Sequence, residues 1–555
     1  MNILIEGRPV ELKPGQTIMD MAREAGLMGS SLKDRPLAAR IGGEIFNLAY
    51  TPMHEIDIDL LYFDDEEGVR VYERTLQFVL IMCARKLFGK TRVFVRYSLG
   101  KGLYITIDKE PKFSEADMEL LKAEMQKVTA LDLPLQRKRI NIQEALEFYE
   151  KDGQLDKAEL LKWRRFNYFD VYRCPDYSDY IDYYYGETAP STGFVSIFDL
   201  HYKNGGLVLM RPSREEPDRP APYEDFPKMS AVFKRTDDWG RLMTCSTANE
   251  LNTRVQNGSV RELIRVNEAL HEKMYAKTAD AIIARKARAV MIAGPSSSGK
   301  TTSANRIATQ LRAEGLDPIM ISLDNYYADR RFCPRDEKGD YDFEHIDALD
   351  VKRFNHDLEL LMAGEEVEVP VFDFIEGKPK DRGHVMKCGK DQLLIIEGIH
   401  GLNPAMLNDS IDREKVFRVY VSALTTINLD DHNRVRTTDL RILRRLVRDY
   451  ETRGASMERT LSMWPSVRRG EKRWIFPYQE EADMILNTIL HYEPAIMKRH
   501  VYPLLLTVPP ESEYYCMARS IVKYLNYFLE ANVEDEIPPT SVLREFIGGN
   551  TFYKD

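Results

Sequence analysis

Paired cysteines, long apolar runs and an excess of positive charge are all missing from this sequence. Its six cysteines are scattered through 555 residues, and no two of them stand in a C-x-x-C pair. This spacing excludes the usual redox motif and zinc knuckle, and it fits a reduced, cytoplasmic compartment. No apolar run approaches the about 18 residues of a membrane helix, and the first residues lack the basic-then-apolar layout of a signal peptide. We therefore expect a cytoplasmic protein with no membrane partner.

The charge balance is acidic. A net charge of −10 argues against nucleic acid as a general partner, although a local basic region stays open. Apolar residues make up 43% of the chain and charged residues 30%, which is ordinary for a packed protein. The length predicts roughly three or four domains.

The N-terminal half divides into two α+β segments. Residues 1–64 form the first, with strands expected at 2–6, 10–12, 37–48 and 56–62 and a helix capped by Thr17. Residues 65–225 form the second, with helices expected at 71–88, 114–128 and 141–163 and a β-rich stretch at 91–107. Residues 226–286 are expected to be a helical linker.

The pattern changes at residue 287 to an alternation of strands and helices. Buried strands are expected at 289–293, 319–323, 393–396 and 416–421, and helices at 300–314 and 349–363. Such alternation predicts an α/β domain with a parallel sheet covered on both faces. We place this domain at 287–490, followed by a helical extension over 491–555.

A phosphate-binding loop opens this domain. The pattern G-x-x-x-x-G-K-[ST] is matched by Gly294, Pro295, Ser296, Ser297, Ser298, Gly299, Lys300 and Thr301, and Thr302 follows. Glycines let the backbone approach the phosphates, and the helix N-terminus supplies positive potential. Lys300 can reach the β- and γ-phosphates of ATP, and the Thr301 hydroxyl can bind Mg²⁺. The alternative is an ordinary Ser/Gly-rich turn, but an apolar strand precedes the pattern and a helix follows it.

Two acids at strand ends complete a predicted phosphoryl-transfer site. Glu397 ends the apolar strand at 393–396 and fits the role of a second metal ligand. Asp324 ends the strand after the P-loop helix and can deprotonate an attacking hydroxyl. Ligands of open parallel sheets bind at the carboxyl ends of the strands, which is where both acids lie. The alternatives are an ordinary strand-end carboxylate for Glu397 and a helix or turn cap for Asp324.

An arginine-rich segment follows at 434–453. Its arginines are residues 434, 436, 441, 444, 445, 448 and 453. A solvated helix face is the plain explanation of a charge run. Arginine without lysine suits phosphate better, however, so we predict a lid that closes over ATP and stabilises the transferring phosphoryl group.

Residues 287–490 resemble the uridine kinase/phosphoribulokinase family of P-loop kinases. The matching pieces are GPSSSGKTT, ISLDNYY, DFEHIDALD, VPVFDF, LIIEGIH and LRILRRLVRDYETRG, in the family's order. The resemblance implies transfer of a phosphoryl group from ATP, with Mg²⁺, to the 5′-hydroxyl of a nucleoside. It implies Asp324 as the catalytic base and Thr301 and Glu397 at the metal, and it puts Arg441 and Arg444 in the lid. A homo-oligomer is also in keeping with it.

The acceptor site departs from the family pattern. We predict that it comprises Tyr326, Glu344, His345, Phe372, Phe374 and Arg459. Glu344 stands where the family has an Asp for the ribose hydroxyls, and Arg459 stands where it has a lid Gln. The family's Tyr is Phe372, and its base-reading His aligns with Gly377. Losing these hydrogen-bond partners removes discrimination for pyrimidines, so another nucleoside or a sugar-like alcohol stays open.

The N-terminal half resembles parts of threonyl-tRNA synthetase. Residues 1–64 resemble a TGS domain through LAARIGGEIFNL and IDIDLLYFDDEEG, and residues 65–225 resemble the second additional, editing domain. The positions that align with its H-x-x-x-H pair and later Cys and His are Thr75, Val79, Tyr184 and Thr188. None of them can perform that chemistry, so we infer a scaffold without editing activity. RNA binding through the TGS-like region stays open, but docking on the kinase fits the acidic charge at least as well.

The leading interpretation is thus a nucleoside kinase. The alternatives are a sugar-phosphate kinase similar to phosphoribulokinase, which a second basic pocket would favour, and an RNA-binding regulator whose P-loop senses ATP.

Overall fold

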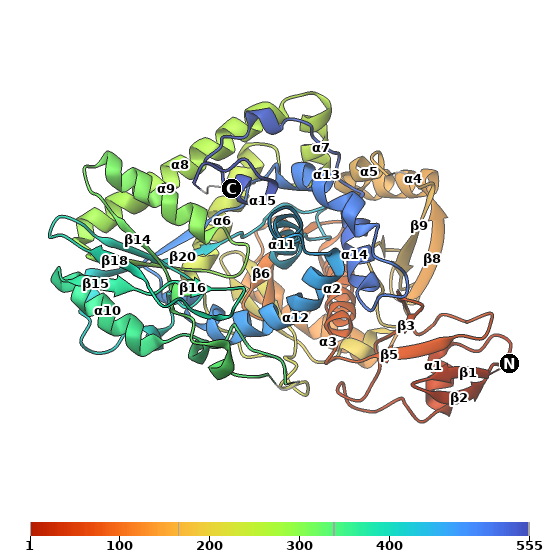
Figure 1. Cartoon of the computed structure of the whole chain (residues 1–555). Coiled ribbons are helices and arrows are strands. Elements are labelled where there is room, and N and C mark those ends of the chain that lie inside the picture. Colours follow the sequence, from red (N-terminus) through yellow and green to blue (C-terminus); the bar gives the residue numbers. More distant parts are fainter. Residues whose placement is uncertain (1, 165, 337–338, 553–555) are drawn as a thin grey trace.

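The computed structural model describes residues 2–164, 166–336 and 339–552 (Figure 1). The N-terminal unit, red in Figure 1, lies at the edge of the molecule. Its elements are β1 (Asn2–Ile5), β2 (Arg8–Glu11), α1 (Ile18–Glu24), β3 (Ala38–Ile41), β4 (Glu44–Phe46) and β5 (Asp57–Leu61). They form a five-stranded sheet in the order β2-β1-β5-β3-β4. Thr17 caps α1 through a reciprocal pair of hydrogen bonds with Asp20, as predicted.

The second unit contains two antiparallel sheets. Its elements are α2 (Glu66–Phe88), β6 (Arg92–Leu99), β7 (Gly102–Asp108), α3 (Glu115–Ala130), β8 (Gln136–Asn141), α4 (Ile142–Asp152), α5 (Leu155–Leu161), β9 (Tyr168–Arg173), β10 (Ile181–Asp182), η1 (Thr192–Val195), β11 (Asp199–Lys203) and β12 (Gly206–Met210). The sheet orders are β11-β12-β7-β6 and β10-β9-β8. The prediction of one helix over 141–163 is wrong: Gly153, in the left-handed region at φ +79°, ends α4 before α5 begins.

The P-loop domain is built on a five-stranded parallel sheet in the order β14-β19-β13-β20-β21. Its main elements are β13 (Ala289–Ala293), α9 (Lys300–Ala313), β14 (Ile319–Ser322), η2 (Leu323–Tyr326), α10 (Val351–Ala363), β19 (Leu394–Glu397), β20 (Val416–Ser422), α11 (Thr437–Arg453), α12 (Met457–Trp474) and β21 (Met484–Asn487). Alternate strand residues face opposite sides, so Ile396 packs with Phe354 of α10 while Ile395 packs with Ile307 of α9. The predicted sheet covered on both faces is confirmed.

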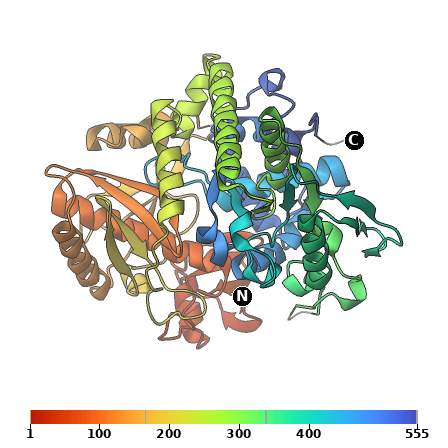
Figure 2. The same ribbon diagram turned by 90° about the vertical axis from the view of Figure 1, so that its left-hand side faces the viewer.

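Helices from before and after the P-loop domain pack against it. They are α6 (Pro227–Leu242), α7 (Ala248–Gln256), α8 (Val260–Arg285), α13 (Glu493–Leu505), α14 (Tyr515–Leu525) and the short α15 (Arg544–Ile547). Figure 2 shows the yellow-green helices of the 226–286 segment between the orange N-terminal half and the green and cyan sheet. One apolar core joins residues of α7, α8, α11, α12, α13 and α14.

A loop of the P-loop domain, residues 423–436, enters the second unit. Val95 of β6 exchanges hydrogen bonds with this loop: Val95 N donates to Asp431 O at 2.9 Å and accepts at its carbonyl oxygen from Asn428 Nδ2 at 3.0 Å. The Arg92 guanidinium donates to the Asp431 carboxylate at 2.8 Å. Because this loop leads directly into α11, the N-terminal half holds the start of the arginine-rich helix.

Fully buried charges fix the same loop. Lys157 Nζ lies 2.5 Å from Asp182 Oδ1 and 3.3 Å from Asp430 Oδ1, and all three side chains have no exposed area. His432 Nδ1 lies 2.7 Å from Asp182 Oδ2, and the Tyr183 hydroxyl donates to Asp430 at 2.9 Å. Burial alone would lower the pKa of Lys157, but Asp182 and Asp430 outweigh it and raise that pKa. The cluster therefore keeps its charges and joins the two halves of the chain.

The six cysteines are free thiols, and Cys83 and Cys174 are buried as predicted. Across the described ranges, none of the helices is both long enough and apolar enough to cross a membrane.

Candidate active site

The P-loop joins β13 to the N-terminus of α9. Gly294 must be a glycine, because a Cβ there would lie 2.0 Å from Val421 O, and Gly299 has a left-handed φ of +86°. Lys300 Nζ lies 3.4 Å from Pro295 O, so the lysine folds back over the loop. The first turn of α9 begins at Lys300 and Thr301 and directs its backbone N–H groups toward the loop. These residues have the arrangement that binds nucleotide phosphates.

The two predicted acids lie at the ends of strands next to the P-loop. In the sheet register, Ile292 of β13 is level with Glu397 of β19, which is level with Ser322 of β14. Asp324 follows Ser322 by two residues, just as Gly294 follows Ile292. The carboxyl ends of three neighbouring strands therefore bring the P-loop, Glu397 and Asp324 to one edge of the sheet.

The electrostatics of this edge are dominated by closely spaced carboxylates. Burial and the negative charge of Asp324 raise the pKa of Glu397 to about 7, although Lys300 and the Ser322 hydroxyl oppose the shift. Ser322 Oγ donates to Glu397 Oε1 at 2.9 Å. Desolvation by the surrounding protein also raises the pKa of Asp324, against Lys300 and Arg453. A raised pKa is what a hydroxyl-deprotonating carboxylate needs near neutral pH.

Three arginines of α11 hydrogen-bond to residues of the P-loop. Arg441 Nε donates to Ser296 O at 2.9 Å, and Arg445 NH1 donates to Ser296 Oγ at 2.9 Å. Arg444 NH1 lies 3.4 Å from Ser297 O. Figure 1 shows α11 near the centre of the molecule, beside α15. The plain explanation of a solvated helix face is therefore wrong for this part of the run.

Buried glutamates pair with two of these arginines. Arg441 contacts Glu471 through both terminal nitrogens, and Arg444 donates to Glu493 at 2.6 and 2.7 Å. Both guanidinium groups are almost completely buried. In this arrangement they brace the P-loop, and their predicted contact with a transferring phosphoryl group stays a prediction.

On the acceptor side, the predicted role of Tyr326 is not supported by the structure. Its side chain is 2% exposed in the core beneath η2, and its hydroxyl donates to Asp357 at 3.1 Å. The Tyr327 hydroxyl instead donates to Phe343 O at 3.1 Å. Burial and the charges of Asp324 and Glu344 raise its pKa, so this hydroxyl lies within electrostatic reach of both acids. A single sequence does not tell which of two adjacent tyrosines turns outward.

Tyr327 belongs to an aromatic wall with Phe372 and Phe374. Its ring centroid lies 5.6 Å from that of Phe372 and 6.4 Å from that of Phe374. Phe374 is 61% exposed, an unusual fraction for a large apolar side chain. The wall offers a surface on which a base or the apolar face of a sugar can pack.

The remaining predicted acceptor residues differ in their positions. Burial and the charge of Glu471 raise the pKa of Glu344 to about 7. Asp324 adds to this rise and Lys300 opposes it, so Glu344 lies among the site's charges. His345 caps η4 (Ile346–Ala348) and packs against Trp474. Arg459 is exposed on the first turn of α12, and none of the side-chain contacts found among the described residues brings it to the site.

One residue of the acceptor side was missed by the sequence analysis. Arg330, in η3 (Arg330–Phe332), donates from NH2 to Phe374 O at 3.1 Å. A Cβ added at Gly377 would lie 2.6 Å from Arg330 Cζ, so the guanidinium fills the space that a side chain at 377 would need. Among the described residues Arg330 makes no ion pair, and its buried Nε has no hydrogen-bond partner. The glycine at 377, where the family has a histidine, was the one sequence signal that another side chain fills this space.

The positions that align with editing residues are packed in the second unit. Thr75 donates to Val71 O at 2.7 Å and accepts from Ala189 N at 2.8 Å. Val79 and Thr188 have no exposed area, and Tyr184 is 8% exposed. The tyrosines at 180, 183 and 184 pack inside their own unit and against the inserted loop, rather than presenting stacking faces to solvent.

Comparison with known proteins separates the two halves. The N-terminal half is 30% identical over 190 residues to a threonine–tRNA ligase of Desulforamulus reducens, a match that covers 34% of this chain and 29% of the ligase. A second ligase, from Carboxydothermus hydrogenoformans, is 29% identical over 181 residues. The chain thus spans less than a third of the length of these ligases.

The C-terminal half matches kinases. A uridine kinase of Staphylococcus aureus is 33% identical over 205 residues, a match that covers 35% of this chain and 84% of that kinase. A solved structure of a possible uridine kinase from Bacillus stearothermophilus is 18% identical, with a TM-score of 0.24, and covers 36% of this chain and 89% of its own. A family model described as Phosphoribulokinase / Uridine kinase family matches residues 289–492. The chain belongs to the phosphoribulokinase/uridine kinase family of P-loop kinases, and it carries an N-terminal half that resembles threonyl-tRNA synthetase.

Proposed function

We propose that this P-loop kinase transfers the γ-phosphoryl group of ATP to the 5′-hydroxyl of a nucleoside. The observation that carries the proposal is the meeting of Asp324, Glu397 and the P-loop at the ends of three neighbouring strands. An ATP sensor needs no acid at the position of Asp324. The aromatic wall of Tyr327, Phe372 and Phe374 supplies a surface for a base next to that acid.

In the proposed mechanism Asp324 accepts the proton of the acceptor hydroxyl as its oxygen attacks the γ-phosphorus. The bond between the β–γ bridging oxygen and that phosphorus breaks, and ADP leaves. Lys300 compensates the charge on the phosphate oxygens, and the backbone N–H groups of the P-loop hold the β-phosphate. Arg441 and Arg445 keep the loop in place through Ser296.

The chemistry of the donor set fits Mg²⁺. Mg²⁺ commonly binds one or two protein groups together with substrate phosphates. The described residues contain no cluster of three or more His, Cys, Asp or Glu side chains that would form a site on their own. Thr301 and Glu397 would hold the ion, which when bound neutralises charge on the β- and γ-phosphates. The crowding of Asp324 and Glu397 that raises the pKa of Glu397 is the repulsion that a cation would relieve.

The dependence of activity on Mg²⁺ is expected to change with pH. With its pKa at about 7, Glu397 becomes protonated as the pH falls through 7, and a protonated carboxyl is a poor metal ligand. The Mg²⁺ concentration for half-maximal ATPase or kinase activity should therefore rise between pH 8 and pH 6. The Glu397→Gln variant should require more Mg²⁺ at every pH and lose this dependence. An unchanged Mg²⁺ requirement from pH 8 to pH 6 in the wild type would contradict the assignment.

A panel of acceptors tests the proposed reaction. ADP release with ATP and Mg²⁺ would be measured with each common nucleoside, with sugar phosphates and with no acceptor, and the phosphorylated product identified by mass. Stimulation by at least one nucleoside and a product carrying the phosphate on its 5′-oxygen are the expected results. No stimulation by any nucleoside would overturn the proposal.

A second candidate, a kinase of phosphorylated sugars, is favoured by Arg330. The guanidinium lies beside the exposed Phe374 and without an ion pair among the described residues, so it supplies a basic group separate from the P-loop. An arginine side chain can bind a phosphate in a bidentate manner, through two parallel N–H···O hydrogen bonds.

The two candidates differ in their response to Arg330→Ala. For a sugar phosphate we expect KM to rise about 10–100-fold, because a charged hydrogen bond contributes about 1.5–3 kcal/mol. For a nucleoside that only packs on the aromatic wall, KM should change little. Steady-state kinetics on the best acceptor of the panel distinguish them, and Arg331→Ala, which alters an exposed arginine paired with Asp329, is the matched control.

A further inference from the structure

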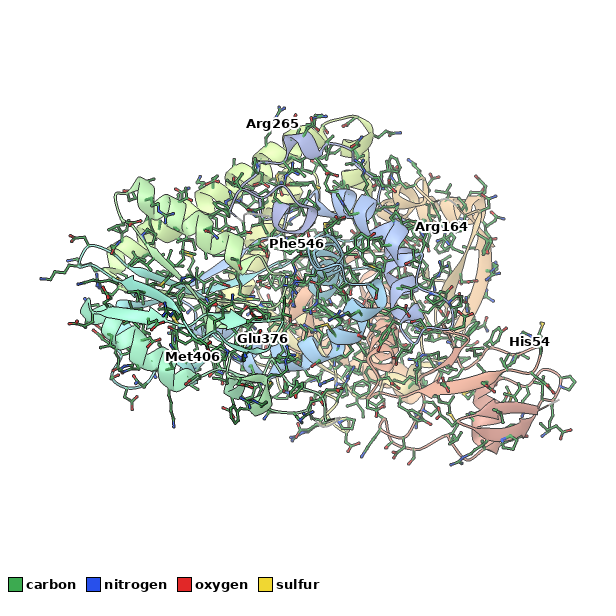
Figure 3. The ribbon with its side chains drawn as sticks, in the orientation of Figure 1. His54, Arg164, Arg265, Glu376, Met406 and Phe546 are labelled. Atoms are coloured by element: carbon green, nitrogen blue, oxygen red, sulfur yellow. The ribbon has the colours of Figure 1, made fainter. Side chains whose placement is uncertain are left out.

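The C-terminal segment 541–547 forms a wall of the P-loop. Val542 is fully buried, and a Cβ added at Gly299 would lie 2.7 Å from its Cγ1. Phe546 is also fully buried, with the Arg444 guanidinium 5.1 Å from its ring centroid. Figure 3 labels Phe546 in the middle of the molecule, although it is only nine residues from the end of the printed sequence. The segment thus packs on the P-loop glycine and on one of the arginines that brace the loop.

The segment is held in place by contacts away from the phosphates. Ser541 Oγ donates to Glu268 Oε1 of α8 at 2.6 Å. Arg544 NH2 donates to Glu534 O at 2.6 Å and to Ile537 O at 3.0 Å. These anchors position the turn that carries Glu545.

Glu545 brings a negative charge to the place where phosphates bind. Thr302 Oγ1, in the first turn of α9, donates to Glu545 Oε2 at 2.6 Å, and Thr302 has no exposed area. The first turn of a helix attracts anions, through its N–H groups and the helix dipole. The negative charge of Glu545 also raises the pKa of Glu397, after the larger effects of burial and Asp324. Its carboxylate is therefore within electrostatic reach of the predicted metal ligand.

We infer that Glu545 is a positioning residue of the nucleotide site that competes with the phosphates of ATP. Its carboxylate accepts the hydrogen bond of the Thr302 hydroxyl when no nucleotide is bound. Bound phosphate repels the Glu545 carboxylate and thereby loosens segment 541–547. Glu545 thereby lowers the affinity of the P-loop for ATP. The inference rests on the proposed function only in that residues 294–302 bind ATP; it does not depend on the acceptor.

Direct nucleotide binding to the full chain tests the inference. Calorimetric titration with Mg·ATP would compare the wild type with Glu545→Gln, which keeps the shape of the side chain and removes its charge. We expect the variant to bind ATP about 3–10-fold more tightly at low salt, with the difference shrinking in about 0.5 M salt because screening weakens the repulsion. Asp535→Asn is the matched control: Asp535 is a tail carboxylate paired with Arg261, away from the P-loop. Its ATP affinity should equal that of the wild type.

The outcomes separate this inference from the proposed function. If the wild type binds no ATP, the proposed kinase function fails. If the wild type binds ATP and Glu545→Gln binds it equally or more weakly, Glu545 is only structural and the inference fails.

A second measurement uses the unaltered protein and so does not depend on the variant folding. Hydrogen exchange of the backbone amides in 541–547 should become faster when Mg·ATP saturates the wild type. Slower or unchanged exchange would overturn the inference.

Discussion

Replacement of Asp324 by asparagine is expected to lower turnover by at least about 10²-fold while ATP binds nearly as in the wild type. General-base catalysis contributes about 10²–10⁴-fold, and the amide cannot accept the proton of the attacking hydroxyl. The P-loop contacts with phosphate do not pass through Asp324, which lies at the end of β14, so ATP affinity should change little. Steady-state kinetics with the acceptor found by the panel, together with calorimetric titration of ATP, measure both quantities.

A neighbouring carboxylate provides the control for this prediction. Asp329, on the same connection, pairs with the exposed Arg331 at 2.7 Å, so Asp329→Asn should keep turnover within about twofold. Loss of ATP binding in Asp324→Asn would mean that Asp324 is structural. Unchanged turnover would remove it from the mechanism.

Replacement of Lys157 by methionine is expected to destabilise the folded chain by about 3–5 kcal/mol. The change leaves Asp182 and Asp430 buried against each other without their shared cation, and breaking a buried pair from one side costs this much. Because the cluster holds the loop that leads into α11, we also expect weaker ATP binding in the variant at temperatures where it stays folded. Urea unfolding followed by tryptophan fluorescence gives the loss of stability.

An exposed lysine of the next turn is the control. Lys162 pairs with Glu159 at the surface, so Lys162→Met should change stability by less than about 1 kcal/mol. The triple change Lys157→Met, Asp182→Leu and Asp430→Leu removes the unpaired charges and should recover part of the loss. Equal stability of Lys157→Met and the wild type would show that the cluster contributes nothing to joining the two halves.

The parallel sheet and the P-loop were predictable because their signals are local. Apolar strands of the right length, a glycine-rich turn and an acid at a strand end each occupy a few consecutive residues. The observed β13 and α9 begin where predicted, and the register then brings Glu397 beside the P-loop without further information. The wrong helix over 141–163 has a local cause as well, since Gly153 was a break signal within a strong helical pattern.

The remaining features depend on contacts between distant segments. Lys157 and Asp430 are 273 residues apart, and nothing in either neighbourhood indicates that both are buried. The sequence predicts Arg444 as a lid arginine, whereas the structure pairs it with Glu493 of the C-terminal helices. Tyr326 and Tyr327 differ only in the direction that the turn after β14 gives them. Such pairings are set by tertiary packing, which periodicity and spacing do not encode.

Segment 541–547 packs on the P-loop but is synthesised long after it, and this order affects when the nucleotide site can form during translation. The P-loop leaves the ribosome about 250 residues before Val542, Glu545 and Phe546, so Gly299 and Arg444 obtain their packing partners only after segment 541–547 has been synthesised. Until then the glycine-rich loop lacks those apolar neighbours. Ribosome-bound chains that end before residue 541 should therefore bind ATP differently from chains that include segment 541–547.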